Sequence, residues 1–238
     1  MKKNKKIFSK NSNWQFRGSV IDNFDYHIDK SVPLYKETHN LYLYLSDFFL
    51  EEKTKIIDIG CSTGTFLQKL IMRHKKVSRF KNIKLIGIDN EKDMITKSKK
   101  KISYKNLKFI NKSVFQTKLN NSCIISSFYT MQFIHVSKRQ KLINKIFKSL
   151  NWGGAFFMVE KVRASDARFQ DIMNQVYIDF KKDMKFSDKE IVNKSRSLKG
   201  VMEPFSSQGN IDLLKRAGFK DILTVFKYGF FEGFLAIK

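Results

Sequence analysis

The stretch Lys55-Ile-Ile-Asp-Ile-Gly-Cys-Ser-Thr-Gly64 decides the fold of this chain, because a short apolar run stops there in a loop of small residues. The isoleucines of the run are β-branched, which is typical of a strand buried on both faces of a parallel sheet. Gly60 and Gly64 let the backbone turn tightly and approach a ligand, and a helix that begins after them points its free N–H groups into the same crevice. The stretch predicts a strand, a ligand-binding loop and a helix in succession.

A second apolar run, Leu85-Ile-Gly-Ile-Asp89-Asn90, ends in a carboxylate that can accept hydrogen bonds from the two hydroxyls of a ribose. The first loop, Asp58-x-Gly60-x-x-x-Gly64, lacks the third glycine of a dinucleotide fingerprint. It is similar instead to the first motif of the class I methyltransferases, whose ligand, S-adenosylmethionine (SAM), carries no phosphate. The alternative is an ordinary strand–helix–strand unit with a solvated Asp89.

Strand and helix patterns alternate along most of the chain, which predicts an α/β fold with a doubly wound, seven-stranded, mostly parallel sheet. The strands are expected at about 55–59, 84–88, 107–110, 123–127, 155–160, 222–226 and 234–237, and helices at about 65–74, 91–102, 138–150 and 211–216. The third of these helices is expected to stop at the glycines of Asn151-Trp-Gly-Gly154, and the last at Gly218.

A single SAM-binding domain is expected over residues 14–238 and includes two helical additions, and a basic tail of residues 1–13 precedes it. Residues 14–50 are expected to form a helical lid, in which Pro33 holds Val32 extended and begins a new helix. Tyr35 is the expected ligand-covering side chain of this lid. Leu34, Leu41, Leu43, Leu45 and Phe48 are expected to cover one side of the sheet.

The second addition is an insertion over residues 161–207, with helices at about 166–182 and 188–199. Ser187 and Glu190 form the pattern of a capping box at the start of the second helix, and Gly200 is a matching stop. The first helix carries an apolar stripe that includes Phe169 and Val176. Packing on the core, a substrate cap and a homodimer surface all remain open for this stripe.

Composition excludes several classes of protein. A formal net charge of +24 favours polyanion binding, although the lysines are spread along the chain as an AT-biased genome would also produce. Cys61 and Cys123 form no paired motif, which predicts no metal or disulfide framework and fits a reducing cytoplasm. The longest apolar stretch, 41–50, is too short to span a bilayer, so no membrane partner is expected.

Few residues suggest acid–base chemistry. His135 follows the fourth predicted strand, where a general base can sit, but a lone histidine in a loop is more often structural. Glu160 and Lys161 end the fifth strand, and pairing with each other is their simplest expected role. Transfer from a sulfonium needs mainly positioning, since the charged sulfur already activates the attached carbon.

Specific motifs distributed over the chain keep a known order at almost a known spacing. They are Ser31-Val-Pro33-x-Tyr35, Asp58-Ile-Gly-Cys-Ser62, Ile88-Asp-Asn90, Gln132-Phe133, Arg139-Gln140, Gly153-Gly154, Glu160-Lys161, Asp179-Phe-Lys181 and Ala217-Gly-Phe219. Through them the chain from Trp14 to Lys238 resembles the carboxy-SAM synthases that serve wobble-uridine modification of tRNA.

The resemblance implies an activity and a cofactor site. The family takes SAM and prephenate, moves the carboxylate lost by prephenate onto the sulfonium methyl group, and releases phenylpyruvate. The residues implied to bind SAM or carboxy-SAM are Tyr35, Gly60, Cys61, Ser62, Gly64, Asp89, Asn90, Ser113 and Val114.

The chain departs from the family pattern at three places. Ser113 replaces an acidic residue near the adenine, and Phe128 replaces an asparagine after the fourth strand. The family's carboxylate-gripping arginine stands in a Lys-Arg pair, whereas this chain reads Lys194-Ser-Arg196. Arg196 is the candidate carboxylate anchor, although one residue rotates a helical side chain by about 100°.

Two other functions stay open. An ordinary SAM-dependent methyltransferase acting on a small molecule or on RNA would keep the same scaffold. A non-catalytic nucleic-acid-binding protein would use the net charge, and it predicts steep salt dependence of RNA binding.

Overall fold

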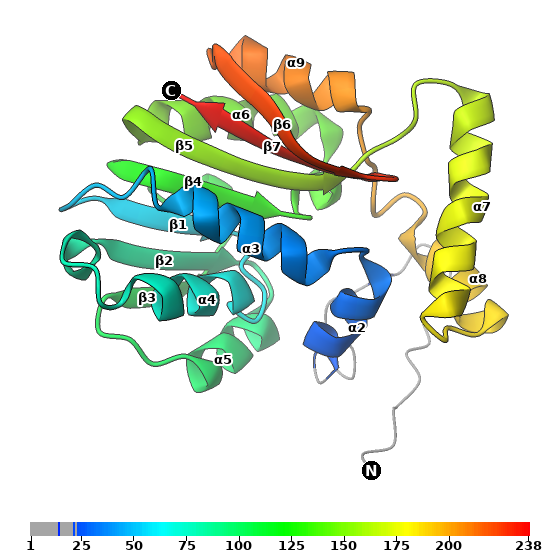
Figure 1. The fold of residues 1–238 in the computed structure, drawn as a ribbon, viewed down its shortest axis with the longest axis horizontal. Coiled ribbons are helices and arrows are strands. Elements are labelled where there is room, and N and C mark those ends of the chain that lie inside the picture. The colour runs from blue at the N-terminus through cyan, green and yellow to red at the C-terminus, as the bar shows by residue number, and fades with distance from the viewer. Residues whose placement is uncertain (1–13, 15–20, 22) are drawn as a thin grey trace.

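A seven-stranded sheet forms the centre of the computed structural model, which describes residues 14, 21 and 23–238 (Figure 1). The basic tail expected over residues 1–13 lies outside the described residues. The strands are β1 Lys55–Ile59, β2 Lys84–Asp89, β3 Leu107–Asn111, β4 Ser122–Phe128, β5 Leu150–Lys161, β6 Asp221–Tyr228 and β7 Phe231–Ile237. Their order is β3-β2-β1-β4-β5-β7-β6, and β7 runs antiparallel to the other six strands. The predicted doubly wound, mostly parallel sheet is confirmed.

Helices cover both faces of the sheet. Apart from the insertion, the elements between strands are α4 Thr65–His74, η1 Arg79–Asn82, α5 Lys92–Lys101, η2 Val114–Gln116, η3 Met131–Phe133, α6 Val136–Ser149 and α9 Ser207–Ala217. Helices α4 and α5 pack on one face, where Leu67 and Ile95 meet Phe109 of β3. Helices α6 and α9 pack together on the other face, so the central strands are buried from both sides, as the β-branched runs predicted.

The N-terminal lid consists of α2 Phe24–Ser31 and α3 Tyr35–Ser46. Val32 between them is extended, as expected before a proline, and Leu34 takes a left-handed conformation with φ of 52°. Tyr42 fastens α3 to the sheet, because its buried hydroxyl donates to the carbonyl oxygens of Met158 and Phe234 at 3.2 and 3.0 Å.

Leu43 and Leu45 pack into the core, as predicted, but two other predicted contacts of the lid are wrong. Leu34 is 43% exposed and Phe48 is 83% exposed, so neither covers the sheet. Leu34 belongs to the left-handed turn between the two helices, and Phe48 follows the end of α3, where the chain leaves the helical face.

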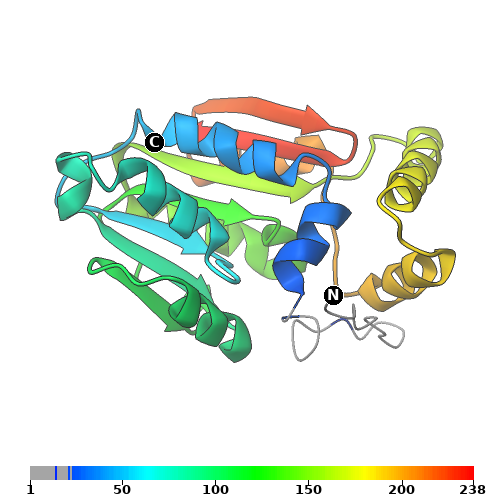
Figure 2. The same ribbon diagram turned by 60° about the horizontal axis from the view of Figure 1, so that its bottom comes forward.

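The insertion comprises α7 Ala167–Asp183 and α8 Asp188–Leu198, which stand off the carboxyl ends of the parallel strands (Figure 1). Figure 2 shows α2 between these helices and the strand ends. The predicted capping box is present, with Ser187 and Glu190 bonded to each other's backbone N–H groups. No residue of α7 is buried, so packing of its whole stripe on the core is excluded.

One predicted helix end needs correction. Helix α6 ends at Ser149 and β5 begins at once with Leu150, whereas the glycines at 153 and 154 were expected to stop the helix. Leu150 is buried and pairs with Ser122 of β4. The helix therefore ends there, and the chain joins the sheet three residues before the first glycine. Gly153 does have a positive φ, 74°, but it lies inside the strand segment where the register shifts. By contrast, Gly218 caps α9 in the left-handed conformation, as predicted.

None of the described helices is both long and apolar enough to cross a membrane. Cys61 and Cys123 are both buried and free.

Candidate active site

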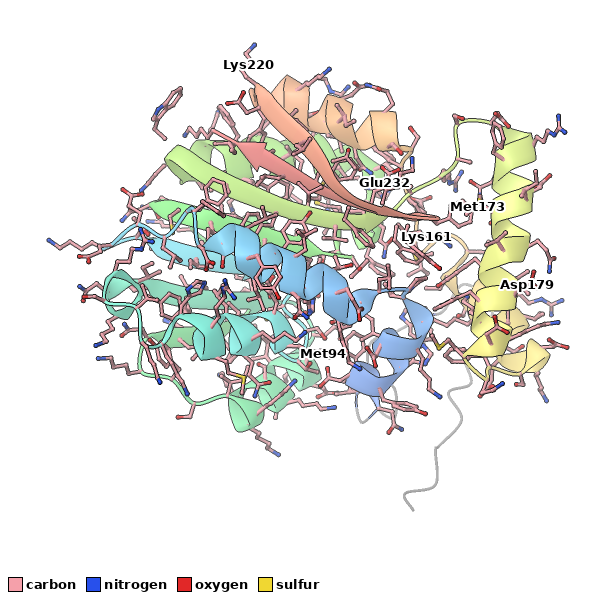
Figure 3. The ribbon with its side chains drawn as sticks, in the orientation of Figure 1. Met94, Lys161, Met173, Asp179, Lys220 and Glu232 are labelled. Atoms are coloured by element: carbon pink, nitrogen blue, oxygen red, sulfur yellow. The ribbon has the colours of Figure 1, made fainter. Side chains whose placement is uncertain are left out.

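A cavity of about 940 Å³ lies where the carboxyl ends of the parallel strands face the lid and the insertion. Its wall includes the loop after β1, the end of β2, the segment after β4, α2, and both insertion helices. Figure 3 shows Lys161 at the end of β5, on the side of the sheet that faces α7, with Met173 of that helix nearby. Ligands of open α/β sheets bind at this edge, so the position agrees with the predicted site.

The loop after β1 is fixed against β2 by backbone hydrogen bonds. The N–H groups of Gly60 and Cys61 donate to the carbonyl oxygen of Ile88 at 2.8 and 3.1 Å. Gly60 has φ of 70°, and a Cβ atom there would lie 2.2 Å from Oγ1 of Thr130, so no other residue fits. Gly64 does not line the cavity, since it packs against Ile102 and Phe109 and positions the start of α4 instead.

Asp89 binds the same loop through its carboxylate. Its two oxygens accept hydrogen bonds from the N–H groups of Ser62 and Glu91, both at 2.9 Å. Burial raises the pKa of Asp89, and these backbone donors oppose the rise. Asp89 and Asn90 both line the cavity, so the remaining lone pairs of the carboxylate are available to a ribose.

Asp58 is a second buried carboxylate in the wall. Ser126 donates to it at 2.7 Å, and burial together with the nearby Asp89 raises its pKa to about 7. Such a group favours a cationic or hydrogen-bond-donating part of a ligand, which would relieve the cost of burying its charge.

Aromatic side chains form the wall on the lid side. The ring of Tyr35 lies 4.4 Å from that of His39 and 5.9 Å from that of Tyr129, and all three line the cavity. Phe128 also lines it, packed at 4.5 Å on Phe66, so the wall is apolar where the family has an asparagine. Burial lowers the pKa of His39 to about 3, which leaves its imidazole neutral.

Three predicted residues lie elsewhere. Ser113 and Val114 follow β3 but do not line the cavity, since the Ser113 hydroxyl caps η2 and Val114 packs in the core beneath α6. Their contact with adenine stays a prediction. His135 is exposed, lies outside the cavity wall, and caps α6 by accepting from the N–H of Ser137, which supports its structural alternative.

Glu160 and Lys161 do not pair with each other, so that expectation is wrong. Glu160 is buried and accepts hydrogen bonds from three successive N–H groups, those of Thr130, Met131 and Gln132, at 2.8 to 3.1 Å. Burial still raises its pKa to about 8. Neighbouring residues of a strand point to opposite faces, so Lys161 turns instead toward the cavity.

The insertion adds cations to the wall. Lys181 of α7 and Lys194, Ser195 and Arg196 of α8 all line the cavity. Lys194 is half-buried while Arg196 is exposed, as expected for residues about 200° apart around a helix. Sequence reasoning named Arg196 and missed Lys194 and Tyr177 as parts of the site, and it used Asp179-Phe-Lys181 as a motif without assigning it a role.

No group of three or more His, Cys, Asp or Glu side chains that could hold a metal ion occurs within residues 14, 21 and 23–238.

Comparisons with known proteins agree with this geometry. Residues 50–218 match the family described as "Methyltransferase domain". The chain is 39% identical over 226 residues to carboxy-S-adenosyl-L-methionine synthase of Staphylococcus epidermidis, covering 94% of this chain and 97% of that one. It is 40% identical over 237 residues to the protein of the same name from Nautilia profundicola, with 98% and 99% covered.

Among solved structures, human N-acetylserotonin methyltransferase in complex with SAM superposes with a TM-score of 0.63. Its identity to this chain is 14%, and the match covers 94% of this chain and 57% of that one, so this likeness concerns the fold alone.

The fold and the site together define a SAM-dependent transferase with a methyltransferase domain. Within that class, identity near 40% over almost the full length is decisive, and the chain belongs to the carboxy-SAM synthase family.

Proposed function

We propose that this protein makes carboxy-SAM from SAM and prephenate. A C–H bond of the sulfonium methyl group is replaced by a bond to the carboxylate carbon that prephenate loses. Prephenate also loses its ring hydroxyl as it becomes phenylpyruvate, and this hydroxyl leaves with the methyl proton as water. SAM supplies an activated methyl carbon, and the residues of the chain bind, orient and enclose the reactants.

One observation carries this proposal: a single cavity joins the nucleoside-binding edge at Ser62 and Asp89 to the cationic wall at Lys161, Lys181 and Arg196. An uncharged methyl acceptor needs no cations beside it. A co-substrate with two carboxylates needs them, because an anion enters a partly buried site at low cost only when charged donors replace its water.

The roles of individual residues follow from their positions. Asp89 accepts from the ribose hydroxyls, and Gly60 to Ser62 let the methionine part approach the backbone. Tyr35 covers the ligand from the lid. Arg196 holds the carboxylate that has moved to the sulfonium side, for which its planar guanidinium is suited. Contact of Ser113 and Val114 with the adenine stays a prediction from the family resemblance, since neither residue lines the cavity.

Mass spectrometry of the small molecule that stays bound to the purified protein tests this function first. The native complex should release carboxy-SAM, and incubation with SAM and prephenate should produce carboxy-SAM and phenylpyruvate in equal amounts. Recovery of SAM alone, with no product from prephenate, would contradict the proposal.

That contrary outcome would favour the second candidate, a methyltransferase acting on a small molecule or RNA. Phe128 is the observation on its side, because this residue makes the wall apolar where the family has an amide. Transfer of a labelled methyl group to an acceptor without prephenate would establish it.

The proposed product supports modification of the wobble uridine of tRNA, so the activity belongs in the cytoplasm. Two free, buried cysteines accord with a reducing compartment. Direct binding of RNA is not required of an enzyme that makes the modifying reagent, and shallow salt dependence of RNA binding is expected.

The exposed stripe of α7 supports a homodimer. Phe169, Ile172 and Val176 are 56%, 51% and 51% exposed and recur at helical spacing. Light scattering of the purified protein is expected to give twice the chain mass, and Val176→Asp to shift it toward the monomer. A monomeric wild type would remove this part of the proposal.

A further inference from the structure

Three lysines gather on the insertion side of the cavity, from three separate elements. Lys161 ends β5, Lys181 lies in the last turn of α7, and Lys194 lies on α8. All three line the cavity and are half-buried. Figure 3 shows the first of them between the end of the sheet and α7.

The ring of Tyr177 organises two of these ammonium groups. Nζ of Lys161 lies 4.5 Å from its centroid, and Nζ of Lys181 lies 4.1 Å from it. The Tyr177 hydroxyl donates to the carbonyl oxygen of Ser31 at 2.7 Å, and its ring packs edge-on against Phe231 at 5.6 Å. The ring is therefore held between the lid, the sheet and the insertion, and it holds both lysines close to one another.

Lys194 is held in a similar way. Its Nζ lies 4.5 Å from the ring of Trp14 and donates to Nε2 of His27. Burial and the neighbouring Lys194 and Lys181 lower the pKa of His27 to about 3, so this imidazole is neutral and accepts the hydrogen bond.

These cations have aromatic and imidazole partners but no carboxylate. The acids that line the same cavity are Asp58, Asp89, Glu91 and Glu203, and within the described part of the chain no Asp or Glu forms an ion pair with any of the three lysines. The adjacent Lys182 does form one, with Asp188 at 3.1 Å on the surface. The three lysines of the cavity thus have no acidic partner, whereas Lys182, next to Lys181 on the same helix, has one.

Burial and mutual repulsion have a measurable consequence. Burial, together with Lys181, Lys199 and Arg163, lowers the pKa of Lys161 to about 8. Burial alone lowers the pKa of Lys181 to about 8, and burial with Lys181 lowers that of Lys194 to about 7. Cation–π contacts offset part of this cost, and a bound anion would offset the rest.

We propose that Lys161 and Lys181, spaced by the ring of Tyr177, hold the carboxylate of the co-substrate that is not transferred and remains on its keto-acid side chain. The inference rests on the proposed function. A co-substrate with two carboxylates needs two anion subsites, and Arg196 serves the one that moves to the sulfonium. The aromatic wall of Tyr177 and Phe231 then faces the six-membered ring between the two carboxylates.

Phenylpyruvate is the diagnostic probe, because it keeps only the retained carboxylate. Its dissociation constant would be measured by calorimetry with SAM at saturation, for wild type, Lys161→Met, Lys181→Met and Lys181→Arg. Lys182→Met is the matched control, since it removes an exposed lysine one position away from the cavity wall.

Each methionine variant should bind phenylpyruvate at least about tenfold more weakly, the usual loss for a charge-assisted contact. The KM for prephenate should rise in parallel, while the affinity for SAM stays within about twofold. Lys181→Arg should recover most of the binding, and Lys182→Met should match wild type. Methionine keeps most of the length of the lysine side chain and removes charge repulsion, so both variants should fold, which thermal unfolding checks.

Unchanged phenylpyruvate affinity in both methionine variants would overturn the inference, as would a wild type that does not bind phenylpyruvate. Weaker binding of carboxy-SAM with unchanged phenylpyruvate would assign the lysines to the transferred carboxylate and also overturn it. Binding of phenylpyruvate at these lysines without any formation of carboxy-SAM would refute the proposed function and leave the anion subsite standing.

Discussion

The two ends of the cavity are built in opposite ways. At the nucleoside end, the carboxyl groups of Asp58 and Asp89 accept hydrogen bonds from Ser126 of β4 and from the backbone beside β1 and β2, so this end is held within three adjacent strands. At the insertion end, Lys161, Lys181 and Lys194 are cationic and have no acidic partner among the described residues. An end whose polar groups are already hydrogen-bonded suits the cofactor, SAM. An end whose lysines have no acidic partner suits a specific anionic co-substrate.

Loss of the glycine turn should have the largest effect and should destroy the nucleoside end. Gly60→Ala places a Cβ atom 2.2 Å from the side chain of Thr130 at a φ of 70°. We expect a loss of about 3 kcal/mol in the free energy of unfolding and no measurable SAM binding. Chemical denaturation and calorimetry measure both quantities.

Gly153→Ala separates the two causes of this effect. Gly153 has a similar φ of 74° but no atom within 4 Å of the added methyl group, so only the conformational cost of about 1 kcal/mol remains. Equal destabilisation by the two substitutions would show that the Thr130 contact is irrelevant.

Removal of the ribose acceptor should affect one end only. Asp89→Ala is expected to weaken SAM binding by about 2 kcal/mol, or roughly thirtyfold, because it removes the acceptor and frees the N–H of Ser62. Binding of phenylpyruvate in the absence of SAM should stay the same. Asp93→Ala, which removes an exposed acid of α5, is the control, and a parallel loss of phenylpyruvate binding would contradict the separation of the two ends.

Arg196 belongs to the insertion end but is proposed to bind the carboxylate of carboxy-SAM, whose nucleoside lies at the other end. Arg196→Ala should weaken carboxy-SAM by about 1.5 kcal/mol, roughly tenfold, and spare SAM, which lacks the carboxylate. Competition between the two compounds in one calorimetric titration measures the difference. Equal weakening of both would refute the assignment of Arg196.

The smallest expected effect is the change in phenylpyruvate affinity with pH. The pKa values of Lys161 and Lys181 are lowered from 10.5 to about 8, and a bound carboxylate favours the charged forms. Their contribution to phenylpyruvate affinity is therefore complete below about pH 7 and declines as the pH rises through 8 toward the higher pKa of the complex, with the greatest proton uptake on binding in that upper range.

Calorimetry in buffers of different ionisation enthalpy detects that uptake. His27, Lys194, Lys199 and Arg163 face the same region, so Lys181→Met is the internal reference. Its uptake should be smaller than that of wild type, and identical uptake would contradict the participation of Lys181.

Local sequence was sufficient for the strands, the helix and the carboxylate of the nucleoside end, although Gly64, Ser113 and Val114 lie outside the cavity wall. The β-branched runs, two glycines and a terminal carboxylate placed β1, β2, α4 and Asp89 to within a residue or two. These features act within one turn or one strand, and the burial of parallel strands leaves few alternatives. The capping box of α8 could be predicted for the same reason, because its partners, Ser187 and Glu190, are only three residues apart.

Only tertiary structure decided the insertion end. Glu160 and Lys161 are neighbours in sequence, yet one binds the turn after β4 and the other faces Tyr177 of α7. The Tyr177 hydroxyl donates to the carbonyl oxygen of Ser31, which lies 146 residues earlier in the sequence, and no local pattern predicts such a contact. Local patterns determine which residues form a helix or strand, but the neighbours of a polar side chain depend on how distant elements pack, and the function of this cavity depends on those neighbours.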